Sequence, residues 1–191
     1  MLNYIIRGDN KMYEGILTTG ITELNSYPKV KYTNYCKQTM ETDLLTIPFE
    51  KPVIESINEV RVNICIEDSH IINTLLGPKL ILNCVKNIKV VYTANNAEQS
   101  LHSSYWKIPF CDFILLNDIS YDDCLSLIKN VFLGIEDICI NNCNDKLINI
   151  SVLYIICPII KEESCLKNHN DNKKQNYSFC NQYGKYSKIY F

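Results

Sequence analysis

The chain lacks an apolar run long enough to cross a bilayer, a cluster of basic residues and a glycine-rich loop. Its longest hydrophobic segment, residues 148–160, is broken by two polar residues and Pro158, whereas a transmembrane helix needs roughly 18 consecutive apolar residues. Lysine and arginine do not cluster and the formal net charge is −2, so we expect binding neither to nucleic acid nor to a membrane. The six glycines are dispersed, which argues against a phosphate-binding loop.

Signals for export and catalysis are also missing. The first nine residues have neither the basic start nor the hydrophobic block of a signal peptide, so we expect synthesis in the cytoplasm without export. No serine lies in a Gly-x-Ser-x-Gly elbow, and no cysteine has a recognisable activating context. We therefore expect a protein that is not an enzyme and that uses no cofactor.

Cysteine is abundant by contrast, with ten residues in the chain. Only Cys139 and Cys143 approach the spacing of metal ligands, and no second pair or nearby histidine accompanies them. We expect no metal site. So many thiols in a protein made in the cytoplasm favour structural thiols, some of them cross-linked after assembly.

The segment from residue 79 to residue 116 predicts the central strands. One face of residues 80–92 carries every second residue as an apolar side chain, including Cys84, which we expect to be a buried thiol. Lys86 interrupts this row, and we expect a bulge or an edge position to absorb it. Trp106 and Phe110 are expected to anchor the core, although together with Tyr105 they could instead form a platform that stacks on a sugar.

The remaining segments also read as strands. Residues 35–52 are extended and contain Pro48 and Pro52, which favours an edge strand or a crossing connection. Residues 60–66 alternate as a half-buried strand, and we expect a turn at residues 67–69, a strand at 71–76 and another turn at 77–78.

In the second half, residues 124–131 have helical spacing, but from Leu127 onward the alternating pattern favours a strand. Residues 148–156 alternate as a final strand. The predicted fold is therefore all-β, an antiparallel β-sandwich or open barrel with extended N- and C-terminal arms.

Three parts are expected along the chain. Residues 1–34 form an N-terminal arm or accessory strands, which pair either with the chain's own sheet or with a neighbouring subunit. Residues 35–157 form the β domain. Residues 158–191 form a polar tail that contains cysteine and aromatic residues, and it is either disordered or ordered on a partner.

Six segments of the chain form an ordered, correctly spaced set of motifs: residues 36–57, 77–80, 88–92, 98–103, 108–114 and 135–138. Together they resemble the SPOCS domain of spore coat and spore morphogenetic proteins from clostridia and related spore formers. The resemblance covers about residues 35–157.

The resemblance implies a β-rich domain that works in spore-envelope assembly and has no catalytic residues to transfer. It also implies synthesis in the mother-cell cytoplasm and deposition around the forespore. Family members often carry several copies of the domain or a peptidoglycan-binding LysM module, whereas this chain has one copy and no such module. We therefore expect a building block of the coat, exosporium or an appendage rather than an adaptor.

The functional hypothesis is a structural subunit that binds further copies of itself, and other spore coat proteins as a further class of partner, and is reinforced by disulfides. Candidates for bonds between subunits are Cys165, Cys180 and Cys36. Candidates for other disulfides are Cys65, Cys111, Cys139 and Cys143. The alternatives are a morphogenetic adaptor that recruits other coat proteins and, third, a carbohydrate-binding module.

Overall fold

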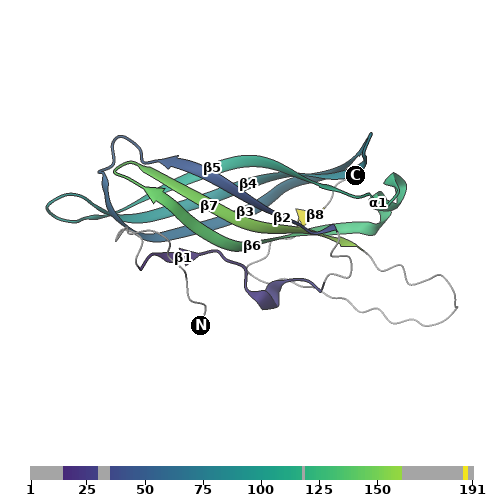
Figure 1. The fold of residues 1–191 in the computed structure, drawn as a ribbon, viewed down its shortest axis with the longest axis horizontal. Helices are drawn as coiled ribbons and strands as arrows, with labels where there is room; N and C mark the ends of the chain where they lie inside the picture. Colours follow the sequence, from purple (N-terminus) through teal and green to yellow (C-terminus); the bar gives the residue numbers. More distant parts are fainter. Residues whose placement is uncertain (1–14, 30–34, 118, 161–186, 189–191) are drawn as a thin grey trace.

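The computed structural model describes residues 15–29, 35–117, 119–160 and 187–188, and it shows two β-sheets packed against each other (Figure 1). Sheet A has the strand order β1-β3-β4-β5, and sheet B has the order β2-β7-β6-β8. The two sheets do not close into a barrel, so the predicted all-β fold is confirmed as a sandwich. No helix among the described residues is both long and apolar enough to cross a membrane.

The strands of sheet A are β1 (Leu17–Thr19), β3 (Ile54–Thr74), β4 (Gly77–Ala94) and β5 (Leu101–Leu115). Those of sheet B are β2 (Lys37–Thr46), β6 (Ile128–Cys143), β7 (Leu147–Ile160) and β8 (Ser187–Lys188). A 3-10 turn, η2 (Leu24–Ser26), and a helix, α1 (Tyr121–Leu127), complete the described elements.

The core lies between β4 and β7. Because successive side chains of a strand point to opposite faces, an alternating apolar row faces the other sheet. In β7 the residues of this row are all 0% exposed: Ile148, Ile150, Val152, Tyr154 and Ile156. The predicted row of β4 is at most 2% exposed: Leu80, Leu82, Cys84, Ile88, Val90 and Tyr92. Both predicted rows are confirmed.

The β3–β4 hairpin corrects two predicted turns. β3 runs without a break through residues 67–69, and its register against β4 shifts between Ile66 and Asp68. A β-bulge therefore accommodates these polar residues where we expected the chain to turn. The turn itself is Leu75–Leu76, and Gly77, with a φ of 106°, opens β4. Glycine adopts this left-handed φ without steric cost.

The helix α1 begins where the sequence supplies a cap. Ser120 accepts a hydrogen bond from the backbone N–H of Asp123 at 3.2 Å, which satisfies one of the N-terminal donors of the helix. The helix ends at Leu127 and β6 begins at Ile128, so the prediction of a strand from about Leu127 onward is confirmed.

The prediction of an edge strand or a crossing connection for residues 35–52 is also confirmed. β2 is the end strand of sheet B, and the chain then crosses to sheet A before β3. The crossing is fixed by backbone hydrogen bonds, in which Ile47 and Ile54 donate to the carbonyls of Lys146 and Asp145, both at 2.8 Å.

Candidate functional site

The two long sides of the sandwich differ. On one side the end strands β2 and β5 lie next to each other, and we call this side the open flank. The indole of Trp106 on β5 donates to the carbonyl of Thr46 on β2 at 3.3 Å. Lys37 on β2 forms an ion pair with Asp112 on β5. Side chains, and no further described strand, connect the two sheets along this flank.

On the other side, which we call the closed flank, the segment 17–27 joins β3 to β6. β1 pairs in parallel with Glu59–Arg61 of β3. Thr22 then exchanges two hydrogen bonds with the backbone of Ile135 on β6, at 2.8 and 2.9 Å. The described part of the predicted N-terminal arm thus pairs with its own chain, which is one of the two alternatives left open by the sequence.

A buried ion cluster lies behind the open flank. Lys86 is 0% exposed, and its ammonium donates to Glu41 at 2.9 Å and to Asp43 at 2.6 Å. It also lies 5.2 Å from the centroid of the Phe110 ring. We expected a bulge or an edge position at Lys86, but β4 is a central strand with an unshifted register there. Two carboxylates on β2 neutralise the lysine instead, because an unpaired buried charge is too costly.

A second cluster surrounds Asp112, which is 7% exposed. Its carboxylate pairs with Lys37 and accepts from the backbone N–H of Phe113 at 2.7 Å and from the Tyr154 hydroxyl at 3.1 Å. Burial first, and then the negative charge of Asp112, raise the pKa of Tyr154. The phenol therefore stays protonated and serves as a hydrogen-bond donor. Sequence reasoning missed this cluster; its one signal was an acidic residue in the inward row of β5.

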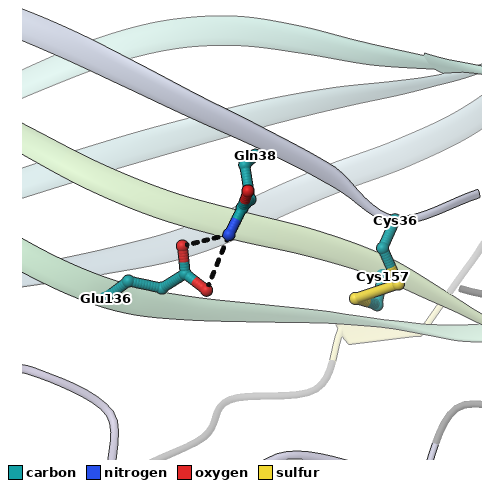
Figure 2. The surroundings of a disulfide bond; sticks show 4 residues. All are labelled: Cys36, Gln38, Glu136 and Cys157. Carbon is teal, nitrogen blue, oxygen red and sulfur yellow. Dashed lines mark hydrogen bonds between the residues drawn. A yellow bond between two sulfur atoms is a disulfide. The ribbon is translucent and has the colours of Figure 1, made fainter.

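A disulfide corrects the role expected for Cys36. The structure joins Cys36 to Cys157 of the same chain, with a Cα–Cα distance of 4.3 Å (Figure 2). The register of Lys37 against Ile156 places these two cysteines directly opposite each other on β2 and β7. Beside them, Gln38 donates to both carboxylate oxygens of Glu136 across β7, at 3.0 and 3.3 Å (Figure 2). Cys36 is thus held within the chain rather than offered to a neighbouring subunit.

The other predicted cysteines have different surroundings. Cys84 is buried, and burial raises its pKa to about 12. Burial also raises the pKa of Cys139 and of Cys143 to about 11. Within the described residues, no disulfide joins Cys111, Cys139 or Cys143 to another cysteine, and Cys111 is exposed.

Three further cysteines were predicted to form disulfides. Cys65 lies on the outer face of sheet A, where its sulfur accepts from the Asn63 amide at 3.1 Å. Cys165 and Cys180 lie outside the described residues.

The aromatic residues predicted for the core lie at its margin. Trp106 and Phe110 are partly buried and pack against the core cluster. The ring of Phe110 lies 5.7 Å from that of Tyr154. The indole N–H of Trp106 is used by Thr46, so this side chain ties β5 to β2 and does not stand as an open platform.

The chemistry available in the described part of the chain is that of surfaces and thiols. No group of three or more His, Cys, Asp or Glu side chains there could hold a metal ion. The carboxylates of the open flank are each paired with a lysine. The open flank therefore presents backbone groups of the two end strands, β2 and β5, to a binding partner.

Comparison with known proteins identifies the domain. The family model described as the SipL, SPOCS domain matches residues 53–142, which span β3 to most of β6. Neither the curated proteins nor the solved structures gave a match. The resemblance predicted from the sequence is confirmed over residues 53–142, which are similar to the SPOCS domain.

Proposed function

We propose that the protein is a non-catalytic structural subunit of the spore surface, in the coat, exosporium or an appendage, and that it assembles with further copies of itself. The observation that carries this proposal is the open flank, where both sheets end in strands that no described strand covers. An uncovered end strand offers unpaired backbone donors and acceptors, which is the usual basis for strand addition by a neighbour.

Two properties of the chain support the proposal. The net charge of −2 does little to oppose association of like molecules. The described surface also exposes several large apolar side chains on β2 and β5, including Met40, Leu44 and Leu101, which are 56%, 66% and 67% exposed.

Thiols reinforce contacts that association has already formed. The disulfide between Cys36 and Cys157 stabilises the subunit itself, and the exposed Cys111 is available on the outside of β5. Cys165 and Cys180 remain candidates for bonds between subunits.

The proposal is tested by sedimentation velocity and negative-stain microscopy of the purified full chain, with and without reductant. We expect concentration-dependent assembly into regular filaments or sheets, with disulfide-linked ladders on non-reducing gels that collapse when reductant is added. A single monodisperse monomer at every concentration, under oxidising as well as reducing conditions, would refute self-assembly.

A second candidate, a morphogenetic adaptor that recruits other coat proteins, is favoured by the tip of the β3–β4 hairpin. Leu75 and Leu76 form this tip and are 101% and 68% exposed. Exposed apolar side chains at a projecting turn suit insertion into a pocket of a different protein. Monodisperse particles that bind a coat protein and lose this binding in Leu75→Ser would support the adaptor.

A further inference from the structure

The two end strands of the open flank do not offer the same backbone surface. In a strand, the N–H and C=O groups of one residue point to the same side, and those of the next residue point to the opposite side. The residues that bond to the neighbouring strand therefore identify, by alternation, which residues present their backbone outward.

For β5 the outward residues have odd numbers. Even-numbered positions bond to β4, since Ala94 donates to the Ser100 carbonyl and Leu116 donates to the Pro78 carbonyl, both at 2.9 Å. One outward position near each end of β5 is capped by a side chain. Lys51 donates to the carbonyl of Ser103. At Phe113, the carboxylate of Asp112 accepts from the N–H and Lys37 donates to the carbonyl.

The middle of β5 is interrupted as well. Pro109 is an outward residue, and proline has no N–H to donate. Between Ser103 and Pro109, only Tyr105 and Lys107 keep both backbone groups in succession, and Lys107 adds a charge to the edge. Capped groups, proline and lysine are the features by which natural edge strands resist pairing.

For β2 the outward residues have even numbers. Ile47, which follows β2, donates to the carbonyl of Lys146, which precedes β7, so the odd-numbered positions of β2 bond to β7. The carbonyl of Thr46 accordingly faces outward, to Trp106. The disulfide agrees, because Cys36 and Cys157 are 4.3 Å apart, the spacing of a pair that is not hydrogen-bonded. From within the described chain, no hydrogen bond reaches the outward backbone groups of four successive positions. These are Gln38, Met40, Thr42 and Leu44.

The side chains of these same residues form a pattern that reads alike in both directions. From Gln38 to Thr46 the outward residues are polar, apolar, polar, apolar and polar, with Thr42 at the centre. All five are exposed. An antiparallel partner with the same sequence, related by a twofold axis at Thr42, would place Met40 beside Leu44 of the second copy. Such self-complementarity is what an interface between identical subunits requires.

We infer that β2 is the edge through which two copies of this chain associate, by antiparallel β2–β2 pairing that joins their two B sheets into one, while β5 is protected from pairing. This inference rests on the proposed self-assembly and specifies its surface. Glu41 and Asp43 of the two copies face each other on the inner side of the pairing, where each carboxylate is neutralised by Lys86 of its own subunit.

The test compares two leucines that match in identity and exposure. Leu44 on β2 is 66% exposed, and Leu101 on β5 is 67% exposed. Leu44→Lys places a charge on the proposed interface twice, and we expect the dissociation constant of the dimer to rise roughly tenfold or more. Leu101→Lys should leave it unchanged. The measurement is sedimentation equilibrium of the full chain in reductant, so that intermolecular disulfides do not contribute.

Two proline variants test the β2 interface independently, through the backbone. Met40→Pro removes an outward N–H of β2 without touching the β7 ladder, and Ser103→Pro does the same on β5. We expect only Met40→Pro to abolish dimers, with thermal melts confirming that both variants fold. If both leucine variants and both proline variants dimerise like the wild type, β2 is not the interface, although self-assembly stands. If wild-type protein remains monomeric throughout, the proposed function and this inference both fail.

Discussion

The closed and open flanks differ in how the two sheets of the sandwich are joined. On the closed flank, backbone from residues 17–27 joins β3 to β6, and the seal consists of ladder hydrogen bonds and a ring contact between Tyr27 and Phe132 at 5.3 Å. On the open flank, charged side chains such as Lys86 hold the sheets together. Apart from the Thr46 carbonyl, which accepts from Trp106, the outer backbone groups of β2 are not used by these side chains.

The difference bears on assembly. A flank sealed by its own backbone has no groups left for a neighbour at those positions, whereas ion pairs that point inward leave the outer edge unoccupied. Buried Lys86 therefore has a structural role in joining the two sheets. Its two carboxylate partners, Glu41 and Asp43, fix the position of β2 relative to β4.

The largest expected effect comes from removing the partners of Lys86. The double variant Glu41→Gln, Asp43→Asn leaves a fully buried ammonium without a counter-charge, and such losses cost about 3–5 kcal/mol of unfolding free energy. Urea unfolding measures this change. Adding Lys86→Met should restore much of the stability, because the buried charge is then gone.

A matched control uses an exposed pair. Lys107 and Glu67 lie 3.4 Å apart with both side chains more than half exposed. The variant Glu67→Gln should change the unfolding free energy by less than about 1 kcal/mol. Equal losses for the buried cluster and the exposed pair would show that Lys86 does not depend on its carboxylates.

The next largest effect is expected from the disulfide. The bond between Cys36 and Cys157 closes a loop with a sequence separation of 121 residues. Closing a loop of this size restricts the unfolded chain, and its loss costs about 2–5 kcal/mol. Reductant should therefore lower the urea midpoint of the wild type but not that of the double variant Cys36→Ala, Cys157→Ala. An unchanged wild-type midpoint would mean that the bond does not stabilise the subunit.

A smaller effect on stability should distinguish two glycines that flank β1. Gly20 and Gly15 both have positive φ angles, 112° and 86°. A Cβ at Gly20 would lie 1.8 Å from the Val62 carbonyl oxygen, whereas one at Gly15 would meet nothing within 4 Å. We expect Gly15→Ala to cost about 1 kcal/mol from backbone strain alone and Gly20→Ala about 3 kcal/mol. Similar thermal melts for both variants would contradict the close contact between residue 20 and β3.

The smallest effect is a loss of stability in alkali. A thiol in the unfolded chain has a pKa of about 8.5, whereas the pKa of Cys84 in the folded protein is about 12. As the pH rises, the Cys84 thiol therefore stays protonated in the folded state after it has ionised in the unfolded state. Its contribution to the unfolding free energy is complete below the unfolded pKa and is lost as the pH rises towards the folded pKa. The melting temperature should fall less for Cys84→Val than for wild type between about pH 8 and about pH 10. Replacing the exposed Cys111 by valine should not reproduce this difference.

Much of the fold followed from the sequence because strand periodicity is a local signal. The apolar rows of β4 and β7 and the crossing after β2 needed only alternation and proline placement. The bulge between Ile66 and Asp68 was read as a turn, because three polar residues in succession carry the same local signal in either structure.

The candidate site was less accessible, since it is built from pairs far apart in the chain. Lys86 pairs with Asp43 and Glu41, which precede it by 43 and 45 positions in the sequence. Asp112 pairs with Lys37 at a sequence separation of 75. One sequence has no signal that links such positions. The partner of Cys36 was hidden for the same reason, because ten cysteines permit many pairings and only the register of β2 against β7 selects Cys157.

Amide hydrogen exchange of dilute and concentrated protein, both in reductant, tests the contrast between the flanks most directly. We expect the outward amides of Met40, Thr42 and Leu44 to exchange fast in dilute protein and slowly in concentrated protein. The amides of Glu41 and Asp43, which bond to β7, should be protected in both. Unchanged exchange on β2 in a sample that has assembled, or new protection at Tyr105 and Lys107 of β5 instead, would contradict the account.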